Sequence, residues 1–328
     1  RGNARGIAAG VAAAGAKASS HRRSMTFQHG QITDAISFVD NGLLGSSGVG
    51  TTYVVRGDEI AIVETGTSFC APTITEGLTA LGVQPSDVRH ILLTHIHMDH
   101  AGGAGLLVDA MPEAQVYIHS LTQQHLVDPE RLISSAQRAL GELFPAHGTI
   151  KPLAPEKLMP AEELDLELGR GIRLHAISTP GHSPDHLSFY EAASGALFAG
   201  DAVGVVLPAF HYLGPVTPPP AVDVEAQHAT FRALLNVPIQ HLLFSHWGPS
   251  SQPAHEVIRR LQKSYDDFDR LVQAAMEQGD VDETAIIREM LPDEQIPDQG
   301  IWLIAGWVRM SIKGMVRYHT KRREAGNQ

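Results

Sequence analysis

Short apolar blocks alternate with polar or glycine-containing turns along most of the chain, a pattern typical of strands and helices that follow one another. Runs rich in β-branched residues predict strands at 52–56, 60–63, 90–93, 115–118, 172–177, 187–190, 196–199 and 241–244. Helical spacing predicts helices at 72–81, 121–143 and 222–235, and proline-rich loops are expected near 145–160 and 208–220.

From Pro253 onward the pattern becomes that of amphipathic helices. Apolar residues between Val257 and Val272 recur at steps of three and four, and two further helices are expected at 283–290 and 301–323. We interpret 253–328 as a helical appendage that packs on the main body or on a second subunit, so a homodimer through these helices is possible. Trp302 and Trp307 are expected to be core or dimer anchors.

Potential metal ligands gather directly after the apolar run 91–93. The stretch 94–100, Thr-His-Ile-His-Met-Asp-His, holds His95, His97, Asp99 and His100. Because side chains alternate along a strand, we expect His95 and His97 to project the same way at the strand end, with Asp99 and His100 in the following turn. This pattern predicts a metal site, and the competing interpretation is a polar surface loop.

Three later positions offer ligands in the same context, each where a predicted strand gives way to a loop. They are His182 after Thr-Pro-Gly, Asp201 after Phe-Ala-Gly, and His246 after Phe-Ser. Strand ends of one sheet can converge on a point, so the hypothesis is that five imidazoles and two carboxylates form one metal centre.

The order of these ligands resembles the metallo-β-lactamase superfamily over about residues 45 to 250. The resemblance implies an α/β (α+β) fold, a four-layer αββα sandwich with the site at one edge, here with a C-terminal helical extension. It also implies that His95, His97 and His182 hold a first metal, that Asp99, His100 and His246 hold a second, and that Asp201 bridges them. Glu64-Thr65-Gly66 departs from the Asp-Thr-Gly of many members, which affects a supporting residue only.

Such a centre predicts a hydrolase acting on a small-molecule ester, thioester or lactone. Two divalent ions sharing a water stabilise hydroxide near neutral pH and polarise a carbonyl oxygen. Metal-bound hydroxide is the expected nucleophile. Asp99 and Asp201 are the expected catalytic carboxylates, with Asp99 holding or shuttling the proton.

Zinc is the expected metal because imidazole-rich ligand sets suit it, although iron or manganese also fit a mixed His and carboxylate shell. Two other functions remain open. One is an iron-dependent oxygenase or redox enzyme of the same superfamily. The retention of His97 favours a hydrolase over a diiron oxygen reductase, since redox members resembling this pattern often have Glu there, but it leaves the mononuclear-iron persulfide dioxygenases open. The other is a non-catalytic protein that binds a ligand through its metals.

Substrate contacts are predicted at three further residues. His186, four residues after His182, is a candidate for orienting the site. The loop 207–215 is expected to run over the cavity, where His211 and Tyr212 could donate a hydrogen bond to a developing oxyanion, or simply form a proline-stiffened surface loop. Apolar residues in this loop and in the appendage suggest a partly hydrophobic substrate.

Composition and net charge indicate which kinds of partner to expect. The 328 residues are 43% hydrophobic and 19% charged, and no apolar run approaches the roughly 18 residues that would span a bilayer, so no membrane association is expected. The net charge is -11; residues 1–24 carry +5, which leaves -16 on the rest, a balance that disfavours nucleic acid as a partner. Cys70, the only cysteine, is expected to be a small buried residue.

The domain organisation has three parts. Residues 1–24, rich in Ala, Gly, Ser and Arg, resemble a processed targeting sequence or an added extension, and are set apart from the fold. Residues 25–252 form the expected catalytic domain, and 253–328 form the appendage. We expect a cytoplasmic location, with organellar targeting by the extension left open.

Overall fold

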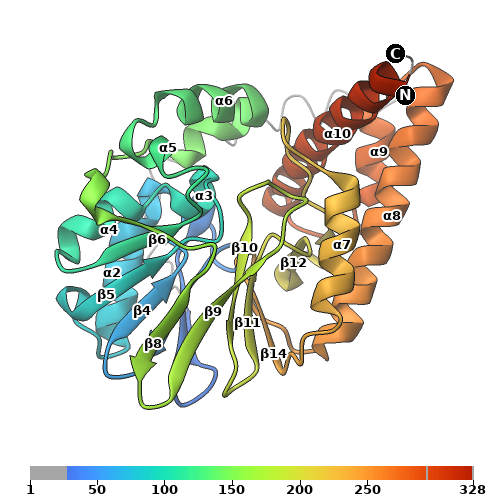
Figure 1. Ribbon diagram of the computed structural model, residues 1–328. Coiled ribbons are helices and arrows are strands. Elements are labelled where there is room, and N and C mark those ends of the chain that lie inside the picture. Colours follow the sequence, from blue (N-terminus) through green and yellow to red (C-terminus); the bar gives the residue numbers. More distant parts are fainter. Residues whose placement is uncertain (1–27, 293–294, 327–328) are drawn as a thin grey trace.

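Two β-sheets face one another between outer layers of helices (Figure 1). This computed structural model describes residues 28–292 and 295–326, so the predicted extension 1–24 lies outside the described residues. The predicted α/β (α+β) sandwich of four layers is confirmed, as are the helices that follow it. None of the helices in these two ranges is both long and apolar enough to span a bilayer.

The first sheet has seven strands in sequence order. Its first four strands pair antiparallel, and the pairs from β4 to β7 are parallel. The strands are β1 (His29–Gln31), β2 (Ile36–Asp40), β3 (Thr51–Arg56), β4 (Ile60–Val63), β5 (Val88–Leu92), β6 (Gln115–Ile118) and β7 (Leu158–Pro160).

The second sheet has six strands in the order β15-β14-β11-β10-β9-β8, with one parallel pair, β11 and β14. Its strands are β8 (Asp165–Gly169), β9 (Ile172–Ser178), β10 (Leu187–Glu191), β11 (Ala196–Gly200), β14 (His241–Phe244) and β15 (Gly248–Pro249). A separate hairpin pairs β12 (Val205–Leu207) with β13 (Tyr212–Gly214), and β13 lies inside the predicted loop 208–220.

Helices α2 and α4 lie outside the first sheet, and α7 and α8 lie outside the second (Figure 1). The helices are α2 (Ala71–Ala80), α3 (Met98–Ala101), α4 (Ala104–Ala110), α5 (Gln124–Val127), α6 (Glu130–Leu140), α7 (Val224–Leu234), α8 (Ala254–Gln278), α9 (Glu283–Met290) and α10 (Asp298–Gly326). Side chains of Asp223 and Asp282 accept backbone hydrogen bonds at the starts of α7 and α9, which fixes where these helices begin.

Alternation along the strands divides the core into two clusters. In β11, Phe198 points into the cluster between the sheets, whereas Leu197 and Ala199 point into the cluster under the outer helices. Buried residues of α8 and α10, including Leu261 and Trp307, belong to the same outer cluster. The C-terminal helices therefore share a hydrophobic core with the sandwich.

The predicted helical region 121–143 contains more than one element. Pro129 precedes α6 and cannot continue a helix from α5, which ends at Val127. At the other end α6 stops at Leu140, because Gly141 adopts a φ of 54°. The result is a short helix followed by the separate helix α6.

Candidate metal centre

All seven predicted ligands meet at one edge of the sandwich, beyond the carboxyl ends of four strands. β5, β9, β11 and β14 end there, and the loops after them carry the ligands. β5 already stops at Leu92, so His95 and His97 lie in a loop and not at the strand end that the sequence predicted, while Asp99 and His100 lie in α3. The seven side chains nevertheless lie together at this edge.

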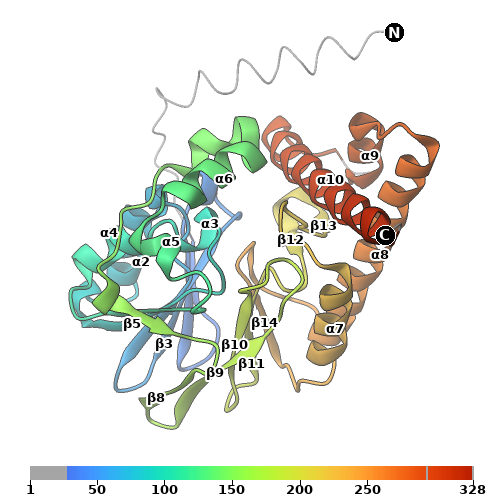
Figure 2. The same cartoon turned by 45° about the horizontal axis from the view of Figure 1, so that its top comes forward.

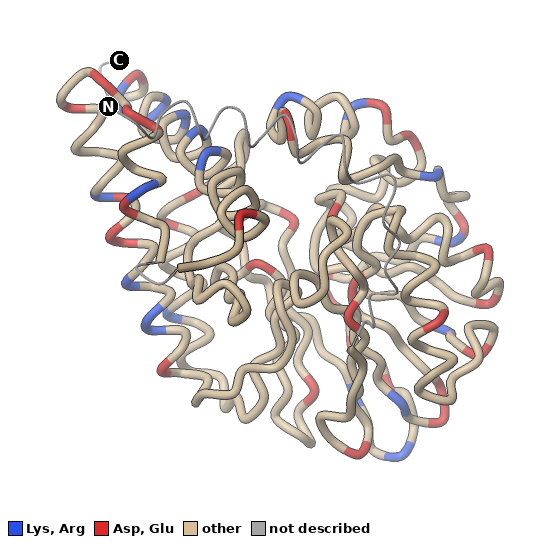
Figure 3. The backbone as a smooth tube through the Cα atoms, turned by 180° about the vertical axis from the view of Figure 1, so that it is seen from behind, with Lys and Arg blue, Asp and Glu red and all other residues tan. Residues whose placement is uncertain are grey.

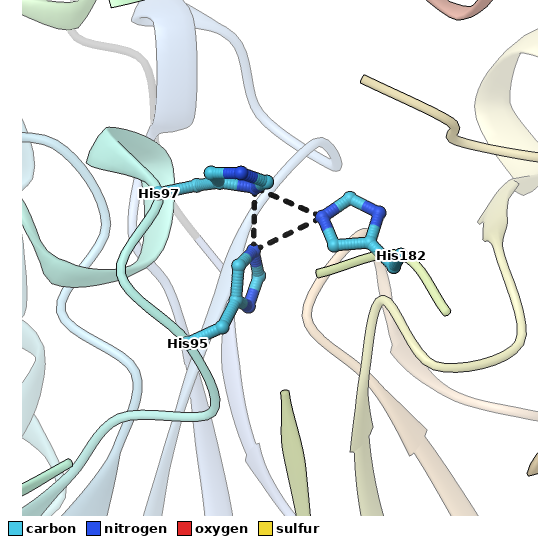
Figure 4. A group of neighbouring side chains, drawn as sticks. All are labelled: His95, His97 and His182. Carbon is cyan, nitrogen blue, oxygen red and sulfur yellow. Dashed lines mark hydrogen bonds between the residues drawn. The ribbon is translucent and has the colours of Figure 1, made fainter. Parts of the chain in front are cut away.

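Three imidazoles form the first group. The rings of His95, His97 and His182 point toward one another, as Figure 4 shows. His97 Nδ1 lies 2.9 Å from both His95 Nε2 and His182 Nε2, and these two Nε2 atoms are 3.2 Å apart. One cation could contact all three nitrogen atoms.

A second group lies beside the first and consists of Asp99, His100 and His246. His246 Nε2 is 3.5 Å from Asp99 Oδ2, and His100 Nε2 is 3.9 Å from the same oxygen. Asp201 lies between the groups, since its Oδ2 is 3.5 Å from His100 Nε2 and 3.6 Å from His182 Nε2. That Asp201 bridges two metal ions stays a prediction.

Contacts on the outer side of the rings decide which nitrogen faces the centre. His182 Nδ1 donates to the carbonyl of Val216 at 2.9 Å, and His246 Nδ1 donates to that of Val49 at 3.1 Å. A carbonyl only accepts, so each neutral ring has its proton on Nδ1 and a lone pair on the inward Nε2. This is the tautomer that binds a metal ion.

The charge and burial of the ligand side chains also indicate a cation site. Burial lowers the pKa of His95 and His182, which favours neutral rings. Although burial opposes it, Asp201 and nearby carboxylates raise the pKa of His100 and His246, because the site holds buried negative charge. Within the described ranges, His100 Nε2 and Asp201 Oδ1 are buried and lack a hydrogen-bond partner. The donor set therefore fits a bound divalent metal.

Glu64 supports the centre from behind. Its Oε1 accepts hydrogen bonds from Thr94 Oγ1 at 2.6 Å, Ser245 Oγ at 2.8 Å and His100 Nδ1 at 3.1 Å. The supporting role predicted for this departure from the common Asp is thus visible in its contacts. Because Glu64 fixes the proton of His100 on Nδ1, it turns the ring's Nε2 toward the centre.

His186 also lies behind the ligands and not in the cavity. Its ring stacks on His95, with centroids 4.9 Å apart, and its Nε2 accepts from the Asp201 backbone N–H at 3.0 Å. Thr179 Oγ1 lies 2.8 Å from its other ring nitrogen. His186 is therefore a positioning residue for Asp201, which corrects the prediction of a substrate contact.

The structure does not bring His211 and Tyr212 to the site. The hairpin of β12 and β13 turns the loop 207–215 away, so that His211 is exposed and Tyr212 is buried in the outer core cluster. Neither residue lines the cavity above the ligands. Cys70 is buried, as predicted, and burial raises the pKa of its thiol to about 11.

A cavity of about 330 Å³ opens above the ligands. Its floor includes His97, Asp99, His182, Asp201 and His246, and its walls come from α6, α10 and the loop 216–221. Trp307 on α10 is 3% exposed and packs on His246, with ring centroids 4.9 Å apart. The sequence indicated Trp307 as an anchor but not as part of the site, because only tertiary packing brings α10 there.

The family can now be assigned. A family model described as the metallo-beta-lactamase superfamily matches residues 46–246. The chain belongs to this superfamily. That membership implies divalent metal binding and supports a metallo-hydrolase at the level of the superfamily. The match ends at His246, so α8, α9 and α10 lie outside it.

Relatives agree with this assignment. The chain is 26% identical over 208 residues to the metallo-beta-lactamase fold-containing protein ST1585 of Sulfurisphaera tokodaii, covering 61% of this chain and 73% of that protein. A crystal structure of ST1585 shares the fold, with a TM-score of 0.67 and 20% identity over 87% of this chain and 99% of that one. Thioesterase pkgB of Emericella nidulans is 29% identical over 49% of this chain, and the chain spans only 38% of it.

Proposed function

We propose that the protein is a dinuclear metal-dependent hydrolase of a small-molecule ester, thioester or lactone. The observation that carries this proposal is the pair of adjacent ligand groups at the floor of a cavity, with Asp201 between them. We propose zinc as the metal, with iron and manganese as the alternatives that metal analysis distinguishes. Among the relatives, the name of pkgB favours a thioester.

The chemistry of the site divides between the metals and the side chains. Bound divalent ions supply hydroxide near neutral pH and polarise the substrate's carbonyl oxygen. Asp99 is the carboxylate suited to hold the released proton, because its side chain is 18% exposed toward the cavity, against 3% for Asp201. Burial opposes its ionisation, but His100 and His246 keep the pKa of Asp99 well below its usual value, so its carboxylate is ionised at neutral pH.

Removal of ligands tests this proposal. His95→Ala and His182→Ala should each lose bound metal and lower kcat/KM by more than the 10- to 100-fold that loss of an outer partner typically causes. His175→Ala is the matched control, because His175 lies on the half-exposed face of β9, the strand before His182. The measurements are elemental analysis and hydrolysis of ester, thioester and lactone substrates.

Two results would refute the proposal. Two equivalents of metal in both ligand variants would show that the ions bind elsewhere. Bound iron with oxygen uptake and no hydrolysis by the wild-type protein would point instead to an oxygenase.

A further inference from the structure

We propose that α10, together with α6, forms an acyl pocket that selects substrates with an apolar acyl group of medium length. This inference rests on the proposed hydrolysis of an ester or thioester. It concerns a segment outside the family match, since α10 begins at Asp298 and the match ends at residue 246. Trp307, Met310 and Ala139 are the proposed specificity-determining residues.

The first observation is that the cavity is continuous with the metal ligands. Side chains of Asp99 and His246 line the same space as Trp307 and Met310 of α10. A substrate whose carbonyl lies at the ligands must therefore place its acyl group against these walls.

The second observation is the chemistry of the walls. On α6, Leu132, Ala136, Ala139 and Leu140 line the cavity, a spacing that defines one face of a helix, together with Arg131 and Ser135. On α10, Trp307 and Met310 are three residues apart and line the same cavity. The apolar part of this lining favours a hydrocarbon group over a charged one, because charged groups lose hydration when buried.

The third observation is that α6 and α10 contact one another. Figure 2 shows α6 and α10 on the same side of the molecule, next to one another. Where they approach, a Cβ added at Gly306 of α10 would lie 2.6 Å from Leu143 Cδ1, just beyond α6. Glycine at 306 thus permits a close contact between the walls.

The size of the cavity suggests an acyl group of medium length. Its volume of about 330 Å³ lies at the lower end of the roughly 300 to 1,000 Å³ that is typical of small-molecule sites. We therefore take octanoyl as the reference length.

A chain-length series tests the pocket. p-Nitrophenyl esters and N-acetylcysteamine thioesters with acyl groups from acetyl to dodecanoyl are to be compared. We expect kcat/KM to rise about fourfold per added methylene, the factor that corresponds to about 0.8 kcal/mol per buried CH₂, and to stop rising near octanoyl.

Variants of the walls locate the pocket. Ala139→Phe fills it and should lower kcat/KM for octanoyl at least tenfold more than it lowers kcat/KM for acetyl. Gln137→Phe is the matched control, because Gln137 is exposed on the same helix.

Met310→Ala should move the preference to longer acyl chains. Lys313→Ala is its control, because Lys313 is exposed on the same helix. Trp307→Phe should retain the octanoyl preference and Trp307→Ala should lose it, with metal content confirmed in both because Trp307 contacts His246.

Kinetic profiles and octanoate binding together distinguish an error in the proposed pocket from an error in the proposed function. A flat chain-length profile in an active enzyme, or equal effects of Ala139→Phe and Gln137→Phe, overturns the pocket and leaves the hydrolase intact. If no substrate is hydrolysed, calorimetry with octanoate decides. Binding that Ala139→Phe weakens at least tenfold supports the pocket, and binding that this variant leaves unchanged overturns it.

Discussion

Glu64 joins three parts of the chain at one carboxylate oxygen. Thr94 follows β5, His100 lies in α3 and Ser245 follows β14, and all three donate to Glu64 Oε1. Glu64 is buried and adopts a φ of 71°, which non-glycine residues rarely adopt, so its surroundings hold it in place. Its charge and its position thus both act on the ligand His100.

Glu64→Gln should weaken metal binding by about 10- to 100-fold, the effect typical of an outer partner of a ligand. The substitution keeps the size of the side chain but removes the negative charge that favours a cation next to His100. Competition with a chromophoric chelator measures the metal dissociation constant. Glu59→Gln is the control, because Glu59 pairs with His90 away from the ligands. An unchanged dissociation constant for Glu64→Gln would refute this role.

At the scale of elements, the turn after β11 places Asp201. Gly200 has a φ of 57°, and a Cβ added there would lie 2.6 Å from His186 Nε2 and 2.9 Å from Thr94 Cβ. Only glycine allows the strand to end this close to the group that fixes the Asp201 backbone. Gly200 thus allows Asp201 to reach the metal centre.

Gly200→Ala should destabilise the fold by about 3 kcal/mol, combining backbone strain with the clash against His186. Gly82→Ala separates the two effects: Gly82 also has a positive φ, of 75°, but has open space around it, so about 1 kcal/mol is expected. Urea unfolding measures both values, and elemental analysis should show metal loss only for Gly200→Ala. Equal destabilisation by the two substitutions would show that the close contact of Gly200 with His186 adds nothing to the backbone strain.

Local patterns predicted the elements with strong periodicity and missed the others. β4, β6, β14 and α9 have the predicted bounds, since compact apolar runs and a capping Asp define them. β1 and β8 are edge strands with exposed polar residues, which resemble loops in sequence. The ligands were predictable because they lie in short segments that follow strands β5, β9, β11 and β14, whereas the cavity walls depend on α6 and α10 meeting across a long stretch of chain.

At the scale of the whole molecule, the apolar residues of the C-terminal helices are largely used within the chain. Leu303, Ile304 and Trp307 are buried in the outer core cluster, so the apolar content that suggested a dimer also has an intramolecular explanation. A homodimer stays a prediction. Positively and negatively charged residues are interspersed along the chain (Figure 3). The absence of a nucleic-acid partner and the cytoplasmic location also stay predictions.

The metal centre should also hold the two halves of the sandwich together. His95, His97, Asp99 and His100 come from the half that contains the first sheet, whereas the other three ligands follow strands of the second sheet. Ions bound between them stabilise the folded chain, because the unfolded chain does not present these seven side chains together.

Chelation of the wild-type protein should therefore lower Tm by roughly 4 °C or more. Metal at 100 times its dissociation constant contributes about 2.7 kcal/mol, and an unfolding entropy of about 2.1 cal/mol/K per residue means that each kcal/mol changes Tm by about 1.5 °C in a chain of 328 residues. Differential scanning calorimetry at several metal concentrations measures the shift, which should grow with the logarithm of the free metal concentration. His182→Ala removes one ligand of the first group and should respond much less to the chelator. If the wild-type Tm is the same with and without metal, the ions do not link the two sheets, and the ligands would have to be arranged in the metal-free protein by packing and hydrogen bonds alone.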